Sequence, residues 1–298
     1  MSSMHTVRRW IEERPVLAFF AGAYALTWGI WFPVLTAIDR GWIAYNTTAI
    51  LALVAGSFGP PVSAAIVTYL TGGSLKGWFS QALRWRVAPR WWLAALGLPL
   101  VLYALMAGVH ILLGGRLNWN EVSPLASMPL AYLNIFIWGG GNEELGWRGF
   151  ALPYLQERYS ALVSSLVIGA VWAVWHAPAG IIERGVTGWA VDLPIYAVIV
   201  IGISIVATLL YNSTGGSVLL TMVFHAGVNA AQGLYPVEGM FTPTGELARF
   251  VAWAVLVGAL LLAFGWRSLA RGDVTDAAQA GMRRLPDGAE SRRQHPTD

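Results

Sequence analysis

Four polar side chains that lie in otherwise apolar stretches are the residues of this sequence best suited to chemistry. They are Glu143, His176, His225 and Asn229. A carboxylate and an imidazole can together take a proton from water, and imidazole and amide N–H groups can stabilise an oxyanion. His225 and Asn229 are four residues apart, which places them on one face of a helix. These residue types predict hydrolysis by an activated water molecule, without a serine or cysteine nucleophile.

Three further residues lie close to these four in the sequence. Glu144 and Arg148 are four residues apart and can form an ion pair on one helix face. Glu143 lies about 100° around the helix from Glu144, so it can point elsewhere. Trp172 precedes His176 by one helical turn. Because charge inside a bilayer costs at least a few kcal/mol per residue, the acidic and basic side chains are expected to face protein or a water-filled cavity.

The composition indicates an integral membrane protein. Of the 298 residues, 56% are hydrophobic and only 12% are charged, whereas an ordinary soluble domain has about 25% charged residues. The chain contains no cysteine. Disulfides, a thiolate metal site and a cysteine nucleophile are therefore excluded.

Eight apolar stretches have about the length that a helix needs to cross a bilayer. The sequence therefore predicts an all-α, polytopic bundle of about eight transmembrane helices within a membrane domain of residues 15–267. Residues 1–14 form a cytoplasmic N-terminal segment, and residues 268–298 form a polar, Arg-rich tail that is expected to be disordered. The apolar stretches are 15–37, 47–70, 91–113, 124–142, 161–181, 191–211, 215–237 and 248–266.

The distribution of basic residues predicts the orientation of the chain. With the N-terminus inside, fourteen Lys and Arg residues fall in inner segments and four fall in outer segments, Arg148 being left out of the comparison. Short cytoplasmic loops collect such residues. We therefore expect a multi-pass protein of a bacterial cell membrane with both termini in the cytoplasm. The four outer residues are Arg40, Arg116, Arg184 and Arg249.

A run of glycines interrupts the segment from 124 to 160. Three glycines at 139–141 are costly in a helix, and Asn142 is a suitable N-cap for a new helix. We therefore expect a break at the glycines and a second helix from about 143 to 158. After a short polar turn, an antiparallel helix would begin with Ser160 as its cap.

The two arms of this hairpin place their polar residues at one depth. Glu143 lies 16 residues before Tyr159, and His176 lies 16 residues after Ser160. Each is therefore about 24 Å from the tip. His225 lies about 15 Å into its own span and meets them if the tip protrudes by about two helical turns. The sequence thus predicts that the catalytic candidates converge on one pocket in the membrane.

The same residues form a set of three motifs. EELGWR at Glu143–Arg148 fits EExxxR, Trp172–His176 fits an aromatic-xxx-His pattern, and His225–Asn229 fits HxxxN. Their order and their placement in separate spans resemble the CPBP family of CAAX proteases and bacteriocin-processing enzymes, also called the Abi family, which includes the type II CAAX prenyl endopeptidases. The resemblance covers about residues 124–232, the expected catalytic core. Trp172 departs from the family, where Phe is common.

The resemblance implies an intramembrane endopeptidase that hydrolyses a peptide bond of a membrane-associated substrate, either prenylated or CAAX-like. Glu143 and His176 would activate a water, and His225 and Asn229 would form an oxyanion hole. The expected partners are membrane lipids and a peptide or lipidated protein substrate, with no nucleic acid. The residues expected to support the site are Glu144, Arg148 and Trp172.

Two mechanisms fit such an enzyme, one glutamate-dependent and the other metal-dependent. Glu143, His176 and His225 have the donor atoms for a zinc site with one open position. The chain lacks the HExxH pattern of many zinc proteases. We therefore expect water activation by Glu143 and His176 without a tightly held metal and commit to no cofactor, with zinc as the alternative.

Two functions from other classes fit the same residues. One is a non-catalytic membrane protein of the immunity type that binds a peptide in the cavity. The other is a proton-coupled transporter that uses Glu143 and Glu144. The sequence shows no internal repeat, which counts against the transporter.

Overall fold

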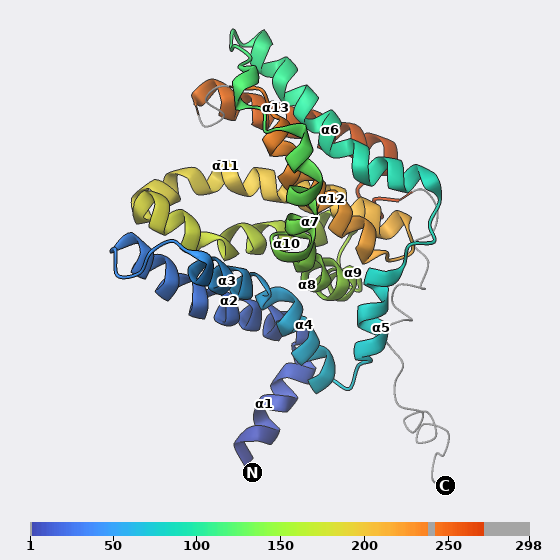
Figure 1. Ribbon diagram of the computed structural model, residues 1–298. Helices are drawn as coiled ribbons and strands as arrows, with labels where there is room; N and C mark the ends of the chain where they lie inside the picture. The colour runs from blue at the N-terminus through green and yellow to red at the C-terminus, as the bar shows by residue number, and fades with distance from the viewer. Residues whose placement is uncertain (1, 238–241, 271–298) are drawn as a thin grey trace.

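The computed structural model describes residues 2–237 and 242–270, and every regular element within them is helical (Figure 1). The predicted all-α class is confirmed. The tail expected to be disordered is residues 268–298, and all of it except 268–270 lies outside the described residues. The α-helices are α1 (Ser2–Glu13), α2 (Pro15–Asp39), α3 (Thr47–Ser57), α4 (Gly59–Leu70), α5 (Leu75–Ser80), α6 (Pro89–Leu112), α7 (Met128–Trp138), α8 (Glu144–Gly146), α9 (Leu152–Gln156), α10 (Ala161–Trp175), α11 (Ala177–Ser213), α12 (Val218–Ala231) and α13 (Pro243–Phe264).

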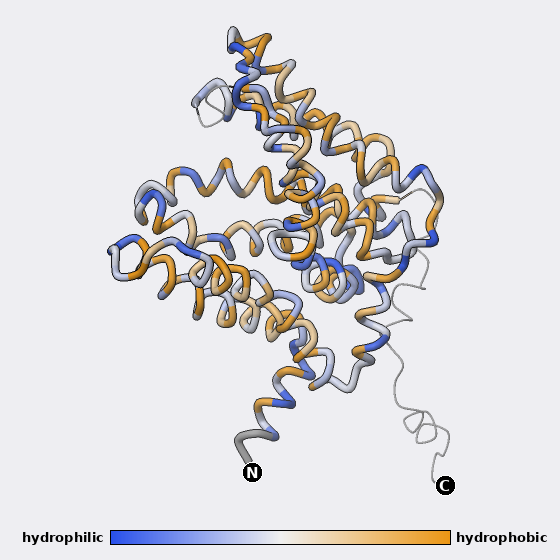
Figure 2. Tube along the Cα trace, viewed as in Figure 1, coloured by the Kyte–Doolittle hydropathy of each residue, from blue (hydrophilic) through white to orange (hydrophobic). Residues whose placement is uncertain are grey.

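The helices are those of a multi-pass membrane protein, and Figure 2 shows apolar residues along most of them. In the described part of the chain, five helices are long and apolar enough to cross a membrane, or six if the bent pair α3–α4 is one span. The expected count of eight is not confirmed. Helices α10 and α12 contain 15 and 14 residues, so they are about 22 Å long, less than the hydrocarbon thickness of about 30 Å.

Helical structure is interrupted for one residue, His176, inside the predicted span 161–181, and the backbone leaves helical geometry again at Gly185, whose φ is +71°, between this span and the predicted span 191–211. Helix α10 stops at Trp175, and α11 begins at Ala177 with Pro178 in its first turn. Proline lacks an N–H group and suits the start of a helix rather than its middle. His176 therefore lies at the junction between α10 and α11.

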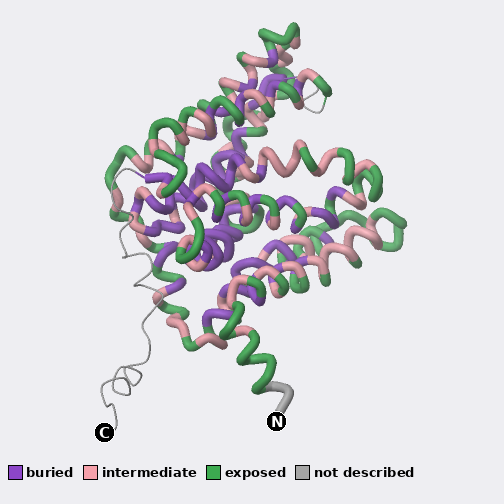
Figure 3. Tube along the Cα trace, turned by 180° about the vertical axis from the view of Figure 1, so that it is seen from behind, coloured by how far each residue is buried: buried purple, intermediate pink, exposed green. Residues whose placement is uncertain are grey.

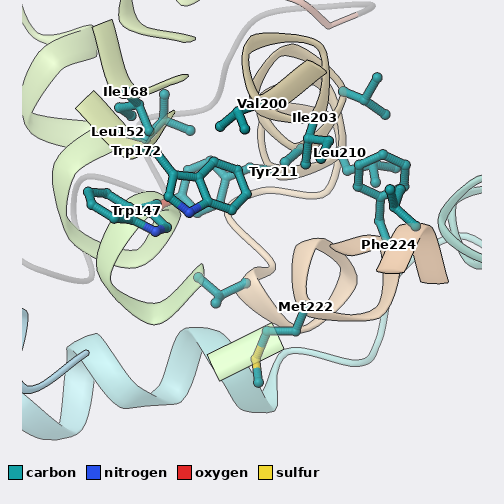
Figure 4. Close-up of a cluster of buried hydrophobic side chains, with 14 of the residues drawn as sticks. Trp147, Leu152, Ile168, Trp172, Val200, Ile203, Leu210, Tyr211, Met222 and Phe224 are labelled. Atoms are coloured by element: carbon teal, nitrogen blue, oxygen red, sulfur yellow. The ribbon is translucent and has the colours of Figure 1, made fainter. Parts of the chain in front are cut away.

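The short helices α10 and α12 occupy the centre of the molecule, where buried residues concentrate (Figure 3). Polar side chains join α10 to α11: Ser165 Oγ donates to Thr208 Oγ1 at 2.8 Å, and Ser204 Oγ donates to the Ser165 carbonyl at 2.8 Å. Such small polar residues let helices approach closely within a membrane. Large side chains that include Trp147, Trp172, Tyr211 and Phe224 fill the remaining core (Figure 4).

The glycine run does break the chain after α7, as predicted, but the segment that follows is not one regular helix. It passes through a 3-10 turn (Gly141–Glu143), α8, a π-helical turn (Trp147–Ala151) and α9. The expected N-cap role of Asn142 is wrong: its Oδ1 accepts from the Gly140 N–H at 3.2 Å, and its Nδ2 donates to the Ser57 carbonyl at 3.3 Å. Asn142 therefore ties the break to α3.

The predicted cap at the other arm of the hairpin is confirmed. Ser160 precedes α10, and its Oγ accepts a hydrogen bond from the Val163 N–H at 3.3 Å. The second span also bends, by 41° between α3 and α4, with Pro60 and Pro61 in the first turn of α4. This bend brings the start of α4 against α8.

The contact between α4 and α8 predicts that Gly146→Ala destabilises the protein. A Cβ atom at Gly146 would lie 2.7 Å from Pro60 Cβ and 2.8 Å from its carbonyl carbon, and overpacking of this kind typically costs about 1–3 kcal/mol. We expect a lower midpoint of thermal unfolding in detergent. The matched control is Gly97→Ala in α6, where a Cβ meets nothing within 4 Å. Equal midpoints for both variants would contradict the close approach.

Candidate active site

The structure brings the four candidate residues together around one cavity of about 440 Å³. Glu143 ends the 3-10 turn before α8, and His176 lies between α10 and α11. His225 and Asn229 lie one turn apart on α12. Thus three separate stretches of chain supply the polar lining.

Two further cavities meet this one at the same side chains. A cavity of about 330 Å³ shares Gly139, Glu143 and His176, and its other walls come mainly from α2, α3 and α7. A second cavity of about 290 Å³ shares His176 and is lined by several charged residues of α11 and α13. Glu143 and His176 therefore lie where an aromatic and aliphatic cavity meets a polar one.

Two tryptophans hold the carboxylate of Glu143. The indole Nε1 of Trp172 donates to Glu143 Oε2 at 2.8 Å, and Trp147 Nε1 makes a longer contact with the same oxygen at 3.5 Å. Both donors meet Oε2, so Oε1 is the oxygen available to a molecule in the cavity. Phenylalanine has no N–H group. The tryptophan at position 172 therefore adds an anchor for the carboxylate that the more common Phe could not provide.

The orientation of His176 follows from its backbone contact. Its Nδ1 lies 3.0 Å from the carbonyl oxygen of Trp172. A carbonyl can only accept, so Nδ1 carries the hydrogen and Nε2 is left as an acceptor when the ring is neutral. The rings of Trp175 and Tyr196 pack edge-on against the imidazole, with centroids at 4.8 and 5.5 Å.

A buried ion pair supports His225. Glu144 Oε1 accepts from Arg148 Nη1 at 3.0 Å, and His225 Nδ1 lies 3.0 Å from the same oxygen. The predicted pair of Glu144 and Arg148 therefore forms, and Glu144 also orients the histidine. Both charged side chains are fully buried, and the guanidinium lies 5.2 Å from the ring centroid of Trp172.

Gly140 lies where the side chains of α12 converge. Its φ of +145° is a conformation that favours glycine. A Cβ atom there would lie 2.8 Å from Asn229 Nδ2 and 3.0 Å from His225 Nε2. Asn229 Nδ2 also donates to the Gly139 carbonyl at 3.2 Å. The sequence analysis treated these glycines only as a helix break and missed that one of them makes room for two donor groups.

The zinc set considered from the sequence does not form in the part of the chain that the structure describes. No group of three or more His, Cys, Asp or Glu side chains there could hold a metal ion. We therefore derive no step through a metal.

The sequence analysis also missed part of the cavity wall. Tyr103, Tyr196, Gln232 and Arg249 line the 440 Å³ cavity together with the four candidates. They come from α6, α11, the turn after α12, and α13. The available sequence signal was weak, because Arg249 stood out only as a charge at the edge of a predicted span.

The fold and the site define a helical membrane protein with a buried polar cavity, and part of this chain is similar to a known family. Residues 124–231 match the family model described as Type II CAAX prenyl endopeptidase Rce1-like. The chain is also 29% identical over 121 residues to CAAX prenyl protease 2 of Methanococcus maripaludis, which covers 38% of this chain and 45% of that protein. The match thus spans less than half of the relative's length. The resemblance to the CAAX protease family is confirmed.

The buried pair predicts a large loss of stability in Arg148→Met. Removal of one partner leaves the Glu144 charge buried without its main counter-charge, which typically costs about 3–5 kcal/mol. Arg8→Met is the matched control, because Arg8 pairs with Glu12 at the same spacing but both side chains are exposed. We expect the control to cost less than about 0.5 kcal/mol. Similar thermal unfolding of the two purified variants would contradict the argument.

Proposed function

We propose that this protein is an intramembrane endopeptidase that hydrolyses a peptide bond of a membrane-associated substrate, either prenylated or CAAX-like. The observation that carries the proposal is the convergence of Glu143, His176, His225 and Asn229 on one cavity. The family similarity supports it over residues 124–231. That similarity covers the motifs but only part of the cavity wall, and the prenylated or CAAX-like substrate is carried over from it.

We assign water activation to Glu143 and His176. Glu143 Oε1 and His176 Nε2 are both acceptors, and two acceptors can hold the two hydrogens of one water. As the water oxygen attacks the carbonyl carbon of the peptide bond, the carboxylate takes a proton. It then passes a proton to the leaving nitrogen as the C–N bond breaks. The reaction is glutamate-dependent in this scheme.

We assign oxyanion stabilisation to His225 and Asn229. Asn229 Nδ2 has two hydrogens, of which one is engaged by the Gly139 carbonyl. His225 Nδ1 is held by Glu144, so Nε2 faces the space beside Gly140 and donates when the ring carries both hydrogens. Donors aimed at a developing negative charge often make the largest catalytic contribution.

The first test is turnover in Glu143→Gln and His176→Ala. Loss of acid–base catalysis should lower kcat at least a hundredfold, whereas Glu121→Gln, at an exposed loop carboxylate, should not change it. The measurement is mass spectrometry of a farnesylated peptide incubated with the purified protein in detergent. The Glu143→Gln variant can also trap substrates for identification.

Three results would contradict this proposal. Full turnover in either variant would remove that residue from the mechanism. Peptide binding without any cleavage by the wild-type protein would favour an immunity-type binding protein. Proton flux coupled to solute uptake in proteoliposomes, lost in Glu143→Gln, would favour a transporter.

The second test is Gly140→Ala. The added methyl group would displace the donors at Asn229 and His225, so we expect kcat to fall by about 10²–10³-fold with little change in KM. Gly97→Ala is the control, and thermal unfolding checks that both variants fold. A rise in KM at unchanged kcat would instead place Gly140 in substrate binding.

A further inference from the structure

Arg249 lies on α13 with its side chain at the wall of the 440 Å³ cavity. Among the described residues that line this cavity, it is the one that carries a permanent positive charge. It also lines the polar cavity of about 290 Å³, where it faces Glu246 and the residues near the Gly185 kink of α11. Arg249 therefore marks the boundary between the candidate catalytic cavity and a polar vestibule.

The surroundings of Arg249 are largely aromatic. The side chain is half-buried and lines the 440 Å³ cavity together with Tyr103 and Tyr196, while Glu246 lines the polar vestibule beside it. The rings of Tyr103 and Tyr235 stack edge-on at 5.4 Å. Aromatic walls exclude water and lower the local dielectric, which makes a charge–charge interaction stronger than in bulk water.

Arg249 lines the same cavity as the proposed water-activating pair. Tyr196 lines this cavity as well, and its ring packs against His176 with a centroid distance of 5.5 Å. A substrate whose peptide bond lies at Glu143 would therefore meet the Arg249 guanidinium a few residues further along the substrate. A short segment beyond the cleaved bond would reach it.

The two sides of Glu143 differ in polarity. The 330 Å³ cavity on one side has walls of Trp31, Leu53 and Trp138, which suit an apolar or lipidated part of a substrate. The other side leads to Arg249 and the vestibule. A guanidinium fork matches a carboxylate with two parallel hydrogen bonds. The carboxylate that any linear peptide carries is the one at its C-terminus.

We propose that Arg249 binds the C-terminal carboxylate of the substrate and so selects a peptide bond a few residues from the end of the chain. This inference rests on the proposed peptidase function and adds to it a residue outside the motifs. It also gives the substrate a direction, with its apolar part towards α2 and α3 and its C-terminus towards α13.

The test compares two probe peptides. Both are farnesylated on a cysteine followed by two aliphatic residues and Met, and one has a free C-terminal carboxylate whereas the other is amidated, which removes the terminal charge. For the wild-type protein we expect kcat/KM to be about tenfold to a hundredfold higher for the free acid. In Arg249→Gln this ratio should fall towards one. In Arg249→Lys it should be intermediate, since the charge stays but the fork is lost.

Arg116→Gln, at an exposed arginine outside the cavity, is the control and should keep the wild-type ratio. A wild-type protein that cleaves both peptides equally would overturn the proposal, as would an Arg249→Gln variant that loses activity on both by the same factor.

The affinity of the Glu143→Gln variant for each peptide separates the peptidase function from the proposed carboxylate site at Arg249. If the wild-type protein cleaves neither peptide but this variant prefers the free acid, the peptidase function fails and the carboxylate site stands. Equal affinities would overturn the site.

Discussion

The requirement that buried charge be paired organises this structure. Glu144 and Arg148 are fully buried, and an unpaired charge in that setting would cost several kcal/mol. The single oxygen Glu144 Oε1 meets both Arg148 and His225, and the guanidinium stacks on Trp172. The pair thus connects α8, α10 and α12. The donors and acceptors proposed for catalysis are attached to these three connected elements.

The irregular backbone between α7 and α9 is the second feature that shapes the site. Irregular backbone at membrane depth is tolerated where protein or a cavity satisfies its polar groups. Asn142 does this for Gly140, and the Gly139 carbonyl accepts from Asn229. The positive φ of Gly140 lets the backbone come next to His225 and Asn229. Sparsely populated backbone conformations of this kind cluster at functional sites.

The family similarity divides the site into two parts. The matched segment, residues 124–231, holds the proposed catalytic groups and their supports. Much of the wall that a substrate would touch lies outside it, including Trp31 of α2, Tyr103 of α6 and Arg249 of α13. The tryptophan at position 172 modifies the shared part, because its N–H group anchors Glu143.

The sequence by itself determined the features that depend on local geometry. The helical class, the break at the glycines, the Ser160 cap and the pair of Glu144 and Arg148 follow from propensity and from contacts within one turn. The hairpin arithmetic assumed the constant rise of an α-helix, which the 3-10 and π-helical turns beside α8 do not keep, although Glu143 and His176 do line one cavity.

Only the tertiary structure decided the features that depend on distant segments. The one-residue junction at His176 and the short α10 and α12 reflect packing inside the bundle, which a count of apolar residues does not contain. The contact of Asn142 with Ser57, the converging donors at Gly140 and the position of Arg249 join residues far apart in the chain. Such contacts are selected by packing and by the need to satisfy buried polar groups, and no local pattern encodes them.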